Sequence, residues 1–318
     1  MASIFVCESL SAGAAGAADD QLLAAGVAMR NAIVDDLLRM AGVAVTCAVG
    51  PGPGCAAPRH GSGTRCASAS ARPGEAVRDF VGRMAALHDL CWIVAPETGG
   101  ELARLHAAVG ARPWIGCDAA AIACAASKRA TLAALAAAGV PTPLDGAGRH
   151  RGRWVVKPDD GAGCLSTRVV AGRAAAAPYL HDAATTVQPW VEGDALSISM
   201  IAGAGRAEAV SFNRQRIAID ADGRLAYLGV RAAALDAGTD PRVPRLRAIA
   251  AATARALPGL GGFVGIDVVW NEVRGPVVIE VNPRVTSAYV GLSERLGRNL
   301  ARDVLRLKLM ERRHALPA

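Results

Sequence analysis

Two of the three lysines in this chain stand where a phosphate-binding site would need them. The chain has 32 arginines but only three lysines, Lys128, Lys157 and Lys308. Arginine is a wide planar fork, whereas lysine is a compact point charge on a flexible stem. A retained lysine therefore indicates a place, such as a crowded polyphosphate pocket, where arginine would not fit. The competing interpretation is that Lys128 and Lys157 are surface charges without a role.

Three oxygen-bearing side chains lie on two neighbouring apolar segments. Residues 265–269 are apolar apart from Asp267, and residues 279–284 contain Glu280 and Asn282. The turn between the segments predicts a hairpin, in which the three side chains can face the same side. Such oxygen ligands suit Mg²⁺, with Mn²⁺ as an alternative, because Mg²⁺ takes phosphate oxygens and water as its other ligands. A lone buried aspartate could be a satisfied structural group, but three such groups need a partner, since buried charge is costly.

A glycine-rich loop follows Lys157. Residues 159–164 contain Gly161 and Gly163, and a turn of this kind between two strands can bring backbone N–H groups close to phosphate oxygens. The loop lacks the spacing of a P-loop, and Gly-x-Gly also occurs in ordinary hairpins. Because few apolar side chains would anchor it, we expect the loop to be a mobile lid over the phosphates.

The segment that begins at Gln188 has the composition of a nucleotide-base pocket. It reads as a strand that breaks into a turn, and its backbone could pair with an adenine. Trp190 and Val191 could wall the adenine ring, and Glu192 or Asp194 could reach the ribose hydroxyls. Taken alone, the segment could equally be a crossover between domains with an aromatic plug.

Composition narrows the function classes. The formal charge is +7 and the pI is near 9.2, but the arginines are scattered and no aromatic–basic interleaving occurs, so nucleic-acid binding is not expected. The eight cysteines form no C-x-x-C pair, which argues against a structural zinc site. The sequence has no long uncharged apolar stretch and no basic leader, so we expect a cytoplasmic protein that does not bind membranes. A homodimer is left open.

The order of the expected elements divides the chain into three units. Residues 1–117 alternate strands and helices, which predicts a small parallel α/β domain. Residues 118–187 open with a helix and continue with short strands, and residues 188–318 hold the longer strands. The expected fold is therefore mixed α/β. The expected details are a single helix over 119–138, a loop over 50–74, a helix around 173–182 and a closing helix from Ser293.

Taken together, the motifs resemble the ATP-grasp superfamily of carboxylate–amine ligases. The chain carries the motifs of the family in the family's order. These motifs are Lys128, the Val-Lys-Pro step with its glycine loop, Gln-Pro-Trp-Val-Glu-Gly, Gly-Ile-Asp-Val-Val and Ile-Glu-Val-Asn-Pro-Arg. The resemblance covers about residues 119–305. It implies a pre-grasp α/β domain, then a smaller ATP-grasp lobe and a larger lobe with the metal site. Residues 5–8, 95–98 and 211–215 are less specific matches. They resemble the branch of the superfamily that includes the tyramine–glutamate ligases of methanofuran biosynthesis.

The resemblance implies a reaction and a role for each motif. A substrate carboxylate takes the γ-phosphate of ATP to give an acyl phosphate, and an amine then displaces phosphate to form an amide. Lys128 and Lys157 would hold the α- and β-phosphates, and the loop from Gly161 to Gly163 would close over the γ-phosphate. The phosphoryl oxygens or the oxyanion would be stabilised by Arg284, or by Arg214 as a second candidate. For each arginine the alternative is a structural ion pair.

The implied cofactors are ATP and Mg²⁺, and the implied partners are a small-molecule carboxylate and an amine. Glutamate with tyramine or tyrosine is the expected substrate pair. Arg284 and the hydroxyls of Thr286, Ser287 and Tyr289 follow the second metal strand, so we expect them to bind an amino acid. The alternative for Thr286 is that its hydroxyl caps the segment leading into the last helix.

Three other functions stay open. A different ATP-grasp ligase, glutamate-adding or dipeptide-forming, would carry the same motifs. A nucleotide-binding regulatory module without catalysis would share the fold, although the intact metal group argues against it. A NAD-dependent dehydrogenase would need a full glycine fingerprint in the N-terminal unit, where residues 8–20 offer only Gly13 and Gly16.

Overall fold

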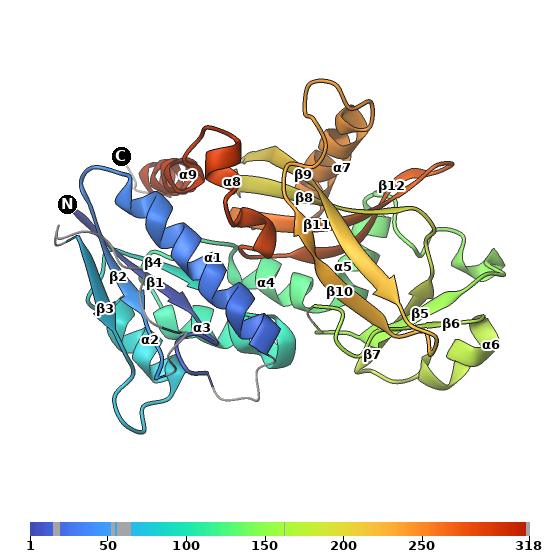
Figure 1. The fold of residues 1–318 in the computed structure, drawn as a ribbon, viewed down its shortest axis with the longest axis horizontal. Helices are drawn as coiled ribbons and strands as arrows, with labels where there is room; N and C mark the ends of the chain where they lie inside the picture. Colours follow the sequence, from blue (N-terminus) through green and yellow to red (C-terminus); the bar gives the residue numbers. More distant parts are fainter. Residues whose placement is uncertain (15–19, 52–54, 56–64, 162, 316–318) are drawn as a thin grey trace.

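The chain folds into three units, each built on its own β-sheet (Figure 1). The computed structural model describes residues 1–14, 20–51, 55, 65–161 and 163–315. The first sheet is parallel and the other two are antiparallel. This mixed α/β architecture with a parallel N-terminal domain confirms the predicted fold class.

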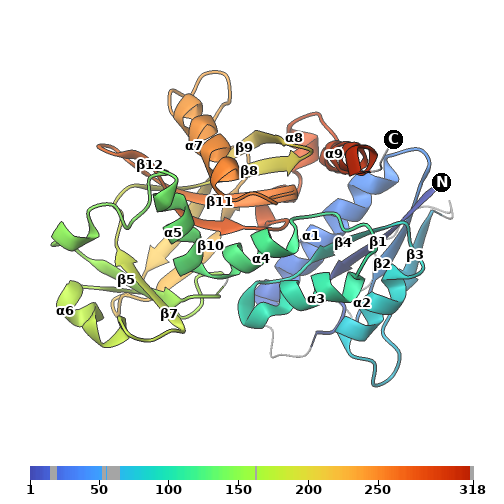
Figure 2. The same cartoon turned by 180° about the vertical axis from the view of Figure 1, so that it is seen from behind.

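The N-terminal domain is a parallel sheet with helices on both faces. Its strands are β1 (Ala2–Glu8), β2 (Val43–Ala48), β3 (Cys66–Ala69) and β4 (Leu90–Val94), in the order β3-β2-β1-β4. One face is covered by α1 (Asp20–Leu38), and the other by α2 (Val77–Ala85) and α3 (Glu101–Val109) (Figure 1, Figure 2). Because both faces are covered, the central strand β1 is mostly buried and β4 is buried along its whole length.

The segment that reads as a loop over residues 50–74 contains β3, so this prediction is wrong in part. β3 pairs in parallel with β2 from Val45↔Cys66 to Ala48↔Ala69. Its small residues carry little intrinsic strand preference, and the strand forms because the edge of β2 offers it hydrogen bonds. Residues 52–54 and 56–64 of the expected loop lie outside the described part of the chain.

The second unit begins with two helices, so the prediction of one helix over 119–138 is wrong. They are α4 (Ala119–Ala126) and α5 (Lys128–Ala137). Between them Ser127 is extended, with φ −103° and ψ 115°, and its hydroxyl accepts a hydrogen bond from the N–H three residues on. The serine ends one helix and caps the next, which apolar periodicity alone does not reveal. The break places Lys128 in the first turn of α5.

A small antiparallel sheet completes the second unit, here called the small lobe. Its central strand is β5 (Trp154–Pro158), between β6 (Arg168–Val170) and β7 (Thr185–Pro189). The helix predicted around 173–182 is much shorter than expected. It comprises α6 (Arg173–Ala176) and a 3-10 turn, because Pro178 has no N–H with which to continue α-helical bonding.

The third unit, here called the large lobe, is a five-stranded antiparallel sheet. Its strands are β8 (Asp194–Gly203), β9 (Arg206–Ile219), β10 (Leu225–Arg231), β11 (Gly262–Asn271) and β12 (Gly275–Asn282), in the order β10-β9-β8-β11-β12. α7 (Val243–Ala256) packs on one face, where Leu246 and Phe212 of β9 share the core. The closing helix predicted from Ser293 is two helices, α8 (Leu292–Arg295) and α9 (Leu300–Ala315), separated near Gly297, whose φ of +59° ends the first.

The chain leaving the N-terminal domain lies directly against the large lobe. The Asp118 N–H donates to the carbonyl of Gly259 at 2.9 Å, and the Cys117 Sγ lies 3.4 Å from the carbonyl oxygen of Gly261. A Cβ at Gly262 would lie 3.0 Å from the Gly116 Cα, so the two backbones approach closely. α9 also packs on α1 of the N-terminal domain (Figure 1). The large lobe therefore has a fixed position against the first domain.

No single helix in the described ranges is long and apolar enough to cross a membrane. α4 and α5 meet the length and composition only when taken together, and they are bent by 105° at their junction.

Candidate active site

The hairpin of β11 and β12 brings the predicted metal ligands together. Asp267 lies directly opposite Glu280 in the strand pairing, and Asn282 lies opposite Gly265. A register shift follows Asp267, which is the kind of bulge that re-aims a side chain beside a functional site. The Asn282 Nδ2 lies 3.3 Å from Asp267 Oδ2. These contacts confirm the expected hairpin and place the three side chains in one group.

The two carboxylates of this group repel each other in a partly buried setting. Burial, and after it the charge of Glu280, raises the pKa of Asp267 to about 7. Hydrogen bonds from Asn282 and from Gln215, whose Nε2 donates to Asp267 Oδ1 at 2.9 Å, act the opposite way. Among the described residues no third carboxylate, histidine or cysteine joins the pair as a metal-ligating cluster, so an amide oxygen would have to serve as the third ligand.

Both candidate lysines lie beside this acidic pair and are buried, each with 5% of its surface exposed. The Lys128 Nζ is 3.2 Å from Glu280 Oε1 and also donates to the carbonyl of Gly161. Burial lowers the pKa of Lys157, an effect that Lys128 reinforces and that Glu280 and Asp267 oppose. Two lysines from the small lobe and two carboxylates from the large lobe therefore converge on one point.

The glycine loop after β5 is held to its surroundings by hydrogen bonds. The Lys128 N–H donates to the Asp159 carbonyl at 3.0 Å, and the Asp159 carboxylate accepts from the Arg129 N–H at 2.9 Å. The Asp160 carboxylate accepts from the N–H of Gly99 at 2.7 Å. Ala162, at the centre of the expected lid, lies outside the described residues. The mobility of this loop stays a prediction.

The segment between the lobes carries the predicted base pocket. Gln188 is buried in β7 opposite Val155, and its Oε1 has no hydrogen-bond partner within the described structure. A buried acceptor without a partner is unusual in a folded protein and indicates a missing donor. The guanidinium of Arg153 lies 5.1 Å from the ring of Trp190, and Val191 is buried.

The two acidic candidates for ribose binding, the exposed Glu192 and the half-buried Asp194, are both paired with arginine. Glu192 lies 2.6 Å from Arg153. Asp194, the first residue of β8, lies 3.1 Å from Arg214 and 3.0 Å from Arg242. Exposed pairs of this kind contribute little free energy, so either carboxylate is able to exchange its arginine for a ligand.

A family model matches the part of the chain that holds this site. The ATP-grasp domain matches residues 125–288, which are 164 of the 318 residues. The chain belongs to the ATP-grasp family. Residues 55–122 match the pre ATP-grasp 3 domain. The two matches confirm the resemblance that the motifs suggested.

Individual ATP-grasp relatives agree with this assignment. Tyramine–L-glutamate ligase of Methanocaldococcus jannaschii is 28% identical over 229 residues. The match covers 70% of this chain and 66% of that protein, just under two thirds of the relative's length. The relative's name supports the prediction of an ATP-dependent carboxylate–amine ligase.

Two solved structures share the fold. An ATP-grasp superfamily protein from Archaeoglobus fulgidus has a TM-score of 0.68 at 22% identity, covering 96% of this chain and 88% of that one. D-alanine–D-alanine ligase from Bacillus anthracis has a TM-score of 0.65 at 12% identity, covering 99% of both chains. At these identities the likeness shows the ATP-grasp fold alone.

The ATP-grasp site does not include Arg214, contrary to its predicted role. Gln215, the next residue on β9, points to Asp267, and successive side chains of a strand point to opposite faces. Arg214 therefore lies on the face that carries α7, where it pairs with Asp194 beside Arg242. Gln215 is the residue of this strand that reaches the carboxylates, and alternation within the motif at 211–215 could have identified it.

Arg284 lies at the site but is paired with a residue of the N-terminal domain. Its Nε donates to Glu97 Oε1 at 2.9 Å and a terminal nitrogen donates to Glu97 Oε2 at 3.0 Å. Both side chains are largely buried, with 13% and 6% exposure. The charges of Glu280 and Asp267 also act on Arg284, which places its guanidinium near the acidic pair. The predicted position is thus compatible with the structure, and so is the alternative of a structural ion pair.

The three hydroxyl groups that follow Arg284 have different surroundings. Tyr289 is wrongly predicted as a substrate contact, because it is 1% exposed and its hydroxyl donates to Asp36 of α1 at 2.7 Å. Ser287 instead reaches the hydroxyl of Tyr227 on β10, a residue that sequence patterns gave no reason to select. Thr286 makes no side-chain cap to the following turn.

Proposed function

We propose that this protein is an ADP-forming ligase that joins a carboxyl group of glutamate to tyramine or tyrosine, in the synthesis of a methanofuran-type cofactor. The observation that carries the ligase assignment is the convergence of Lys128 and Lys157 with Asp267 and Glu280. Phosphoryl transfer requires cations that hold the phosphates and carboxylates that bind a metal ion, and here both lie close together. The substrate pair is supported by the name of the relative from Methanocaldococcus jannaschii.

The donor set fits Mg²⁺. Asp267 and Glu280 lie opposite each other with the Asn282 amide beside them, and burial together with the charge of Glu280 raises the pKa of Asp267. Hard oxygen ligands of this kind with room for water and phosphate oxygens suit the ion, so these three residues would hold it. When bound, Mg²⁺ neutralises the charge on the transferred phosphoryl group.

The residues of the small lobe would bind and enclose the nucleotide. Lys128 and Lys157 would hold the phosphates. To do so, Lys128 would replace its hydrogen bond to the carbonyl of Gly161 with a contact to a phosphate oxygen. The unpartnered Oε1 of Gln188 would accept a hydrogen bond from the amino group of the adenine. The loop from Gly161 to Gly163 would exclude water, which matters because an acyl phosphate hydrolyses readily.

The chain would then position the two halves of the reaction. The glutamate carboxylate attacks the γ-phosphorus, ADP leaves, and the amine nitrogen attacks the acyl carbon of the resulting acyl phosphate. Arg284, close to the acidic pair, would stabilise the oxyanion of the tetrahedral intermediate. Positioning and charge neutralisation carry most of the rate enhancement in such reactions.

The proposal is tested by measuring ADP release with ATP, Mg²⁺, glutamate and either tyramine or tyrosine, with mass spectrometry of the product. Turnover that requires both the carboxylate and the amine supports the assignment. If another amine supports turnover and these two do not, the substrate pair is wrong and the ligase assignment survives. Calorimetry with a non-hydrolysable ATP analogue should show weaker binding in Lys157→Ala, and unchanged affinity in the folded variant would remove Lys157 from the site.

A further inference from the structure

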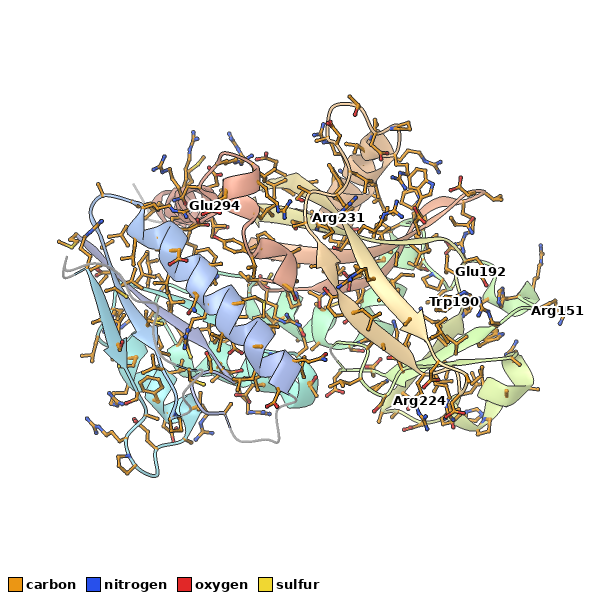
Figure 3. The ribbon with its side chains drawn as sticks, in the orientation of Figure 1. Arg151, Trp190, Glu192, Arg224, Arg231 and Glu294 are labelled. Carbon is orange, nitrogen blue, oxygen red and sulfur yellow. The ribbon has the colours of Figure 1, made fainter. Side chains whose placement is uncertain are left out.

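A pocket of about 450 Å³ lies next to the glycine loop and shares only Gly163 with the proposed nucleotide site. Its walls come from five places in the chain: the start of α1, Val156 of β5, the segment from Gly163 to Arg168, Tyr179 after α6, and residues 224–227 at the start of β10. The small lobe and β10 meet here, because Arg168 and Arg224 form an isolated β-bridge (Figure 3). The pocket is therefore formed by tertiary contacts between both lobes and the N-terminal domain.

The walls of this pocket are mostly apolar and aromatic. The chain has only three tyrosines, and two of them, Tyr179 and Tyr227, line it. Val156, Leu165 and Leu225 complete the apolar wall. Pockets of this volume lined by apolar and aromatic side chains, with a few polar groups, are typical of sites for small organic ligands. The fit is best for a ring, because aromatic side chains pack edge or face against another aromatic group.

Two of the residues that line the pocket lie near the acidic pair. Cys164 and Tyr227 both line it, and the charge of Asp267 acts on both groups. Burial raises the pKa of Tyr227 to about 12 and that of Cys164 to about 11, so both are neutral near neutral pH. The Tyr227 hydroxyl also reaches Ser287, just beyond Arg284. A ligand in the pocket would therefore have one end next to the reacting atoms.

The rim of the pocket contains strained backbone. Of the four non-glycine residues with positive φ in the described ranges, two belong to this loop, Cys164 at 62° and Ser166 at 54°. Such conformations cost free energy and concentrate at ligand sites, where the surrounding structure holds them in place. The loop is thus shaped around this space at an energetic cost.

We propose that this pocket holds the aromatic or apolar side chain of the amine substrate, with the amino group directed past Tyr227 toward the activated carboxyl group. The inference rests on the proposed ligase function and adds the residues that select the amine. The nitrogen forms a bond to the acyl carbon, and the carbon–oxygen bond to phosphate breaks with its electron pair on phosphate. The departing phosphate takes the proton that the nitrogen loses.

The test compares an aromatic amine with one too small to need the pocket. Hydroxylamine attacks an acyl phosphate and leaves a hydroxamate, so it reports the first half-reaction alone. Leu225→Trp fills the pocket, and Leu228→Trp is the matched control, since Leu228 is 53% exposed on the same strand and does not line the pocket. Leu225→Trp should raise the KM for the aromatic amine by about tenfold or more. Hydroxamate formation by Leu225→Trp should stay near that of the wild type. Leu228→Trp should match the wild type both in hydroxamate formation and in its KM for the aromatic amine.

A second variant covers failure of Leu225→Trp to fold. Tyr179→Ala removes an aromatic wall from a half-exposed position and should also raise the KM for the aromatic amine without slowing hydroxamate formation. The inference is overturned if each variant affects both amines equally, or neither, or if the wild type accepts only small aliphatic amines. Absence of hydroxamate and of ADP release in the wild type would instead overturn the proposed function.

Discussion

Asp267 and Glu280 bring two negative charges together at the end of a hairpin, and the neighbouring residues neutralise them only in part. Lys128 pairs with Glu280 at 3.2 Å, while Asp267 receives hydrogen bonds only from the side-chain amides of Gln215 and Asn282. Burial and the charge of Glu280 raise the pKa of Asp267, and the hydrogen bonds and the charge of Arg284 oppose this only in part. The missing positive charge is the physical reason to expect a metal at this position.

Glu280→Gln and Asp267→Asn each remove one charge from this group with almost no change in shape. We expect each to lower ADP release at saturating substrate at least about a hundredfold, equivalent to about 3 kcal/mol of transition-state stabilisation. Glu272→Gln is the matched control, because Glu272 is an exposed carboxylate in the turn of the same hairpin. Turnover close to wild type in both site variants would contradict the metal assignment.

The pKa of Asp267 also predicts a pH dependence. The folded value of about 7 lies above the ordinary value of 3.8, so the folded protein keeps a proton that the unfolded chain has lost, and stability without metal falls as pH rises through this range. A metal needs the carboxylate form, so Mg²⁺ with an ATP analogue should raise the unfolding temperature more at about pH 8 than at about pH 6. Asp267→Asn should abolish this pH difference in the thermal unfolding curves. Equal Mg²⁺ shifts at both pH values in the wild type would refute the assignment.

At the scale of elements, the connection between the lobes depends on the close approach of two segments. Gly193 follows the base-pocket segment with φ +145°, and a Cβ there would lie 2.0 Å from the carbonyl oxygen of Trp270 on β11. The Asn271 side chain donates to the neighbouring carbonyl of Glu192 at 2.9 Å. The connection is thus packed directly on the hairpin of β11 and β12, and only glycine fits at this position.

Gly193→Ala should therefore destabilise the protein by about 3 kcal/mol or more, since backbone strain is added to a steric clash. Gly291→Ala is the control, because Gly291 also has positive φ, +69°, but nothing lies within 4 Å of its Cβ position. The control should lose only about 1 kcal/mol from the left-handed conformation. Urea unfolding measures both, and equal losses would mean that the close approach does not matter.

At the scale of the whole molecule, a buried ion pair joins the N-terminal domain to the end of β12. Glu97 lies just after β4, and the two residues that follow it, Thr98 and Gly99, both donate to Asp160 in the glycine loop. One short segment of the first domain therefore contacts both the arginine beside the acidic pair and the glycine loop. This arrangement gives the N-terminal domain a part in positioning the site.

Glu97→Ala leaves Arg284 buried without its partner. Removing one side of a buried pair typically costs about 3 to 5 kcal/mol, so the free energy of unfolding should fall by about that amount. Glu192→Ala breaks the exposed pair with Arg153 and should change stability by less than about 1 kcal/mol. If denaturant unfolding gives the same small change for both variants, the pair between the domains is not structurally important.

The sequence by itself determined the local chemistry of this protein. The retained lysines, the glycine loop and the single carboxylates in apolar strands are visible as residue types and spacings, because strand alternation and turn chemistry act over a few residues. From these, the hairpin of β11 and β12 and the grouping of its three ligands could be predicted. The ATP-grasp family followed from the order of the motifs.

Tertiary structure alone decided which distant residues complete the site. Glu97, Tyr227 and Cys164 reach it from three separate segments, and no local pattern ties any of them to Asp267. The same contacts turned Arg214 to the opposite face and drew Tyr289 into the core under α1. The edge strand β3 also depended on its pairing with β2. Side-chain alternation and capping are local, but burial and pairing are properties of the whole fold, so only the folded chain fixes them.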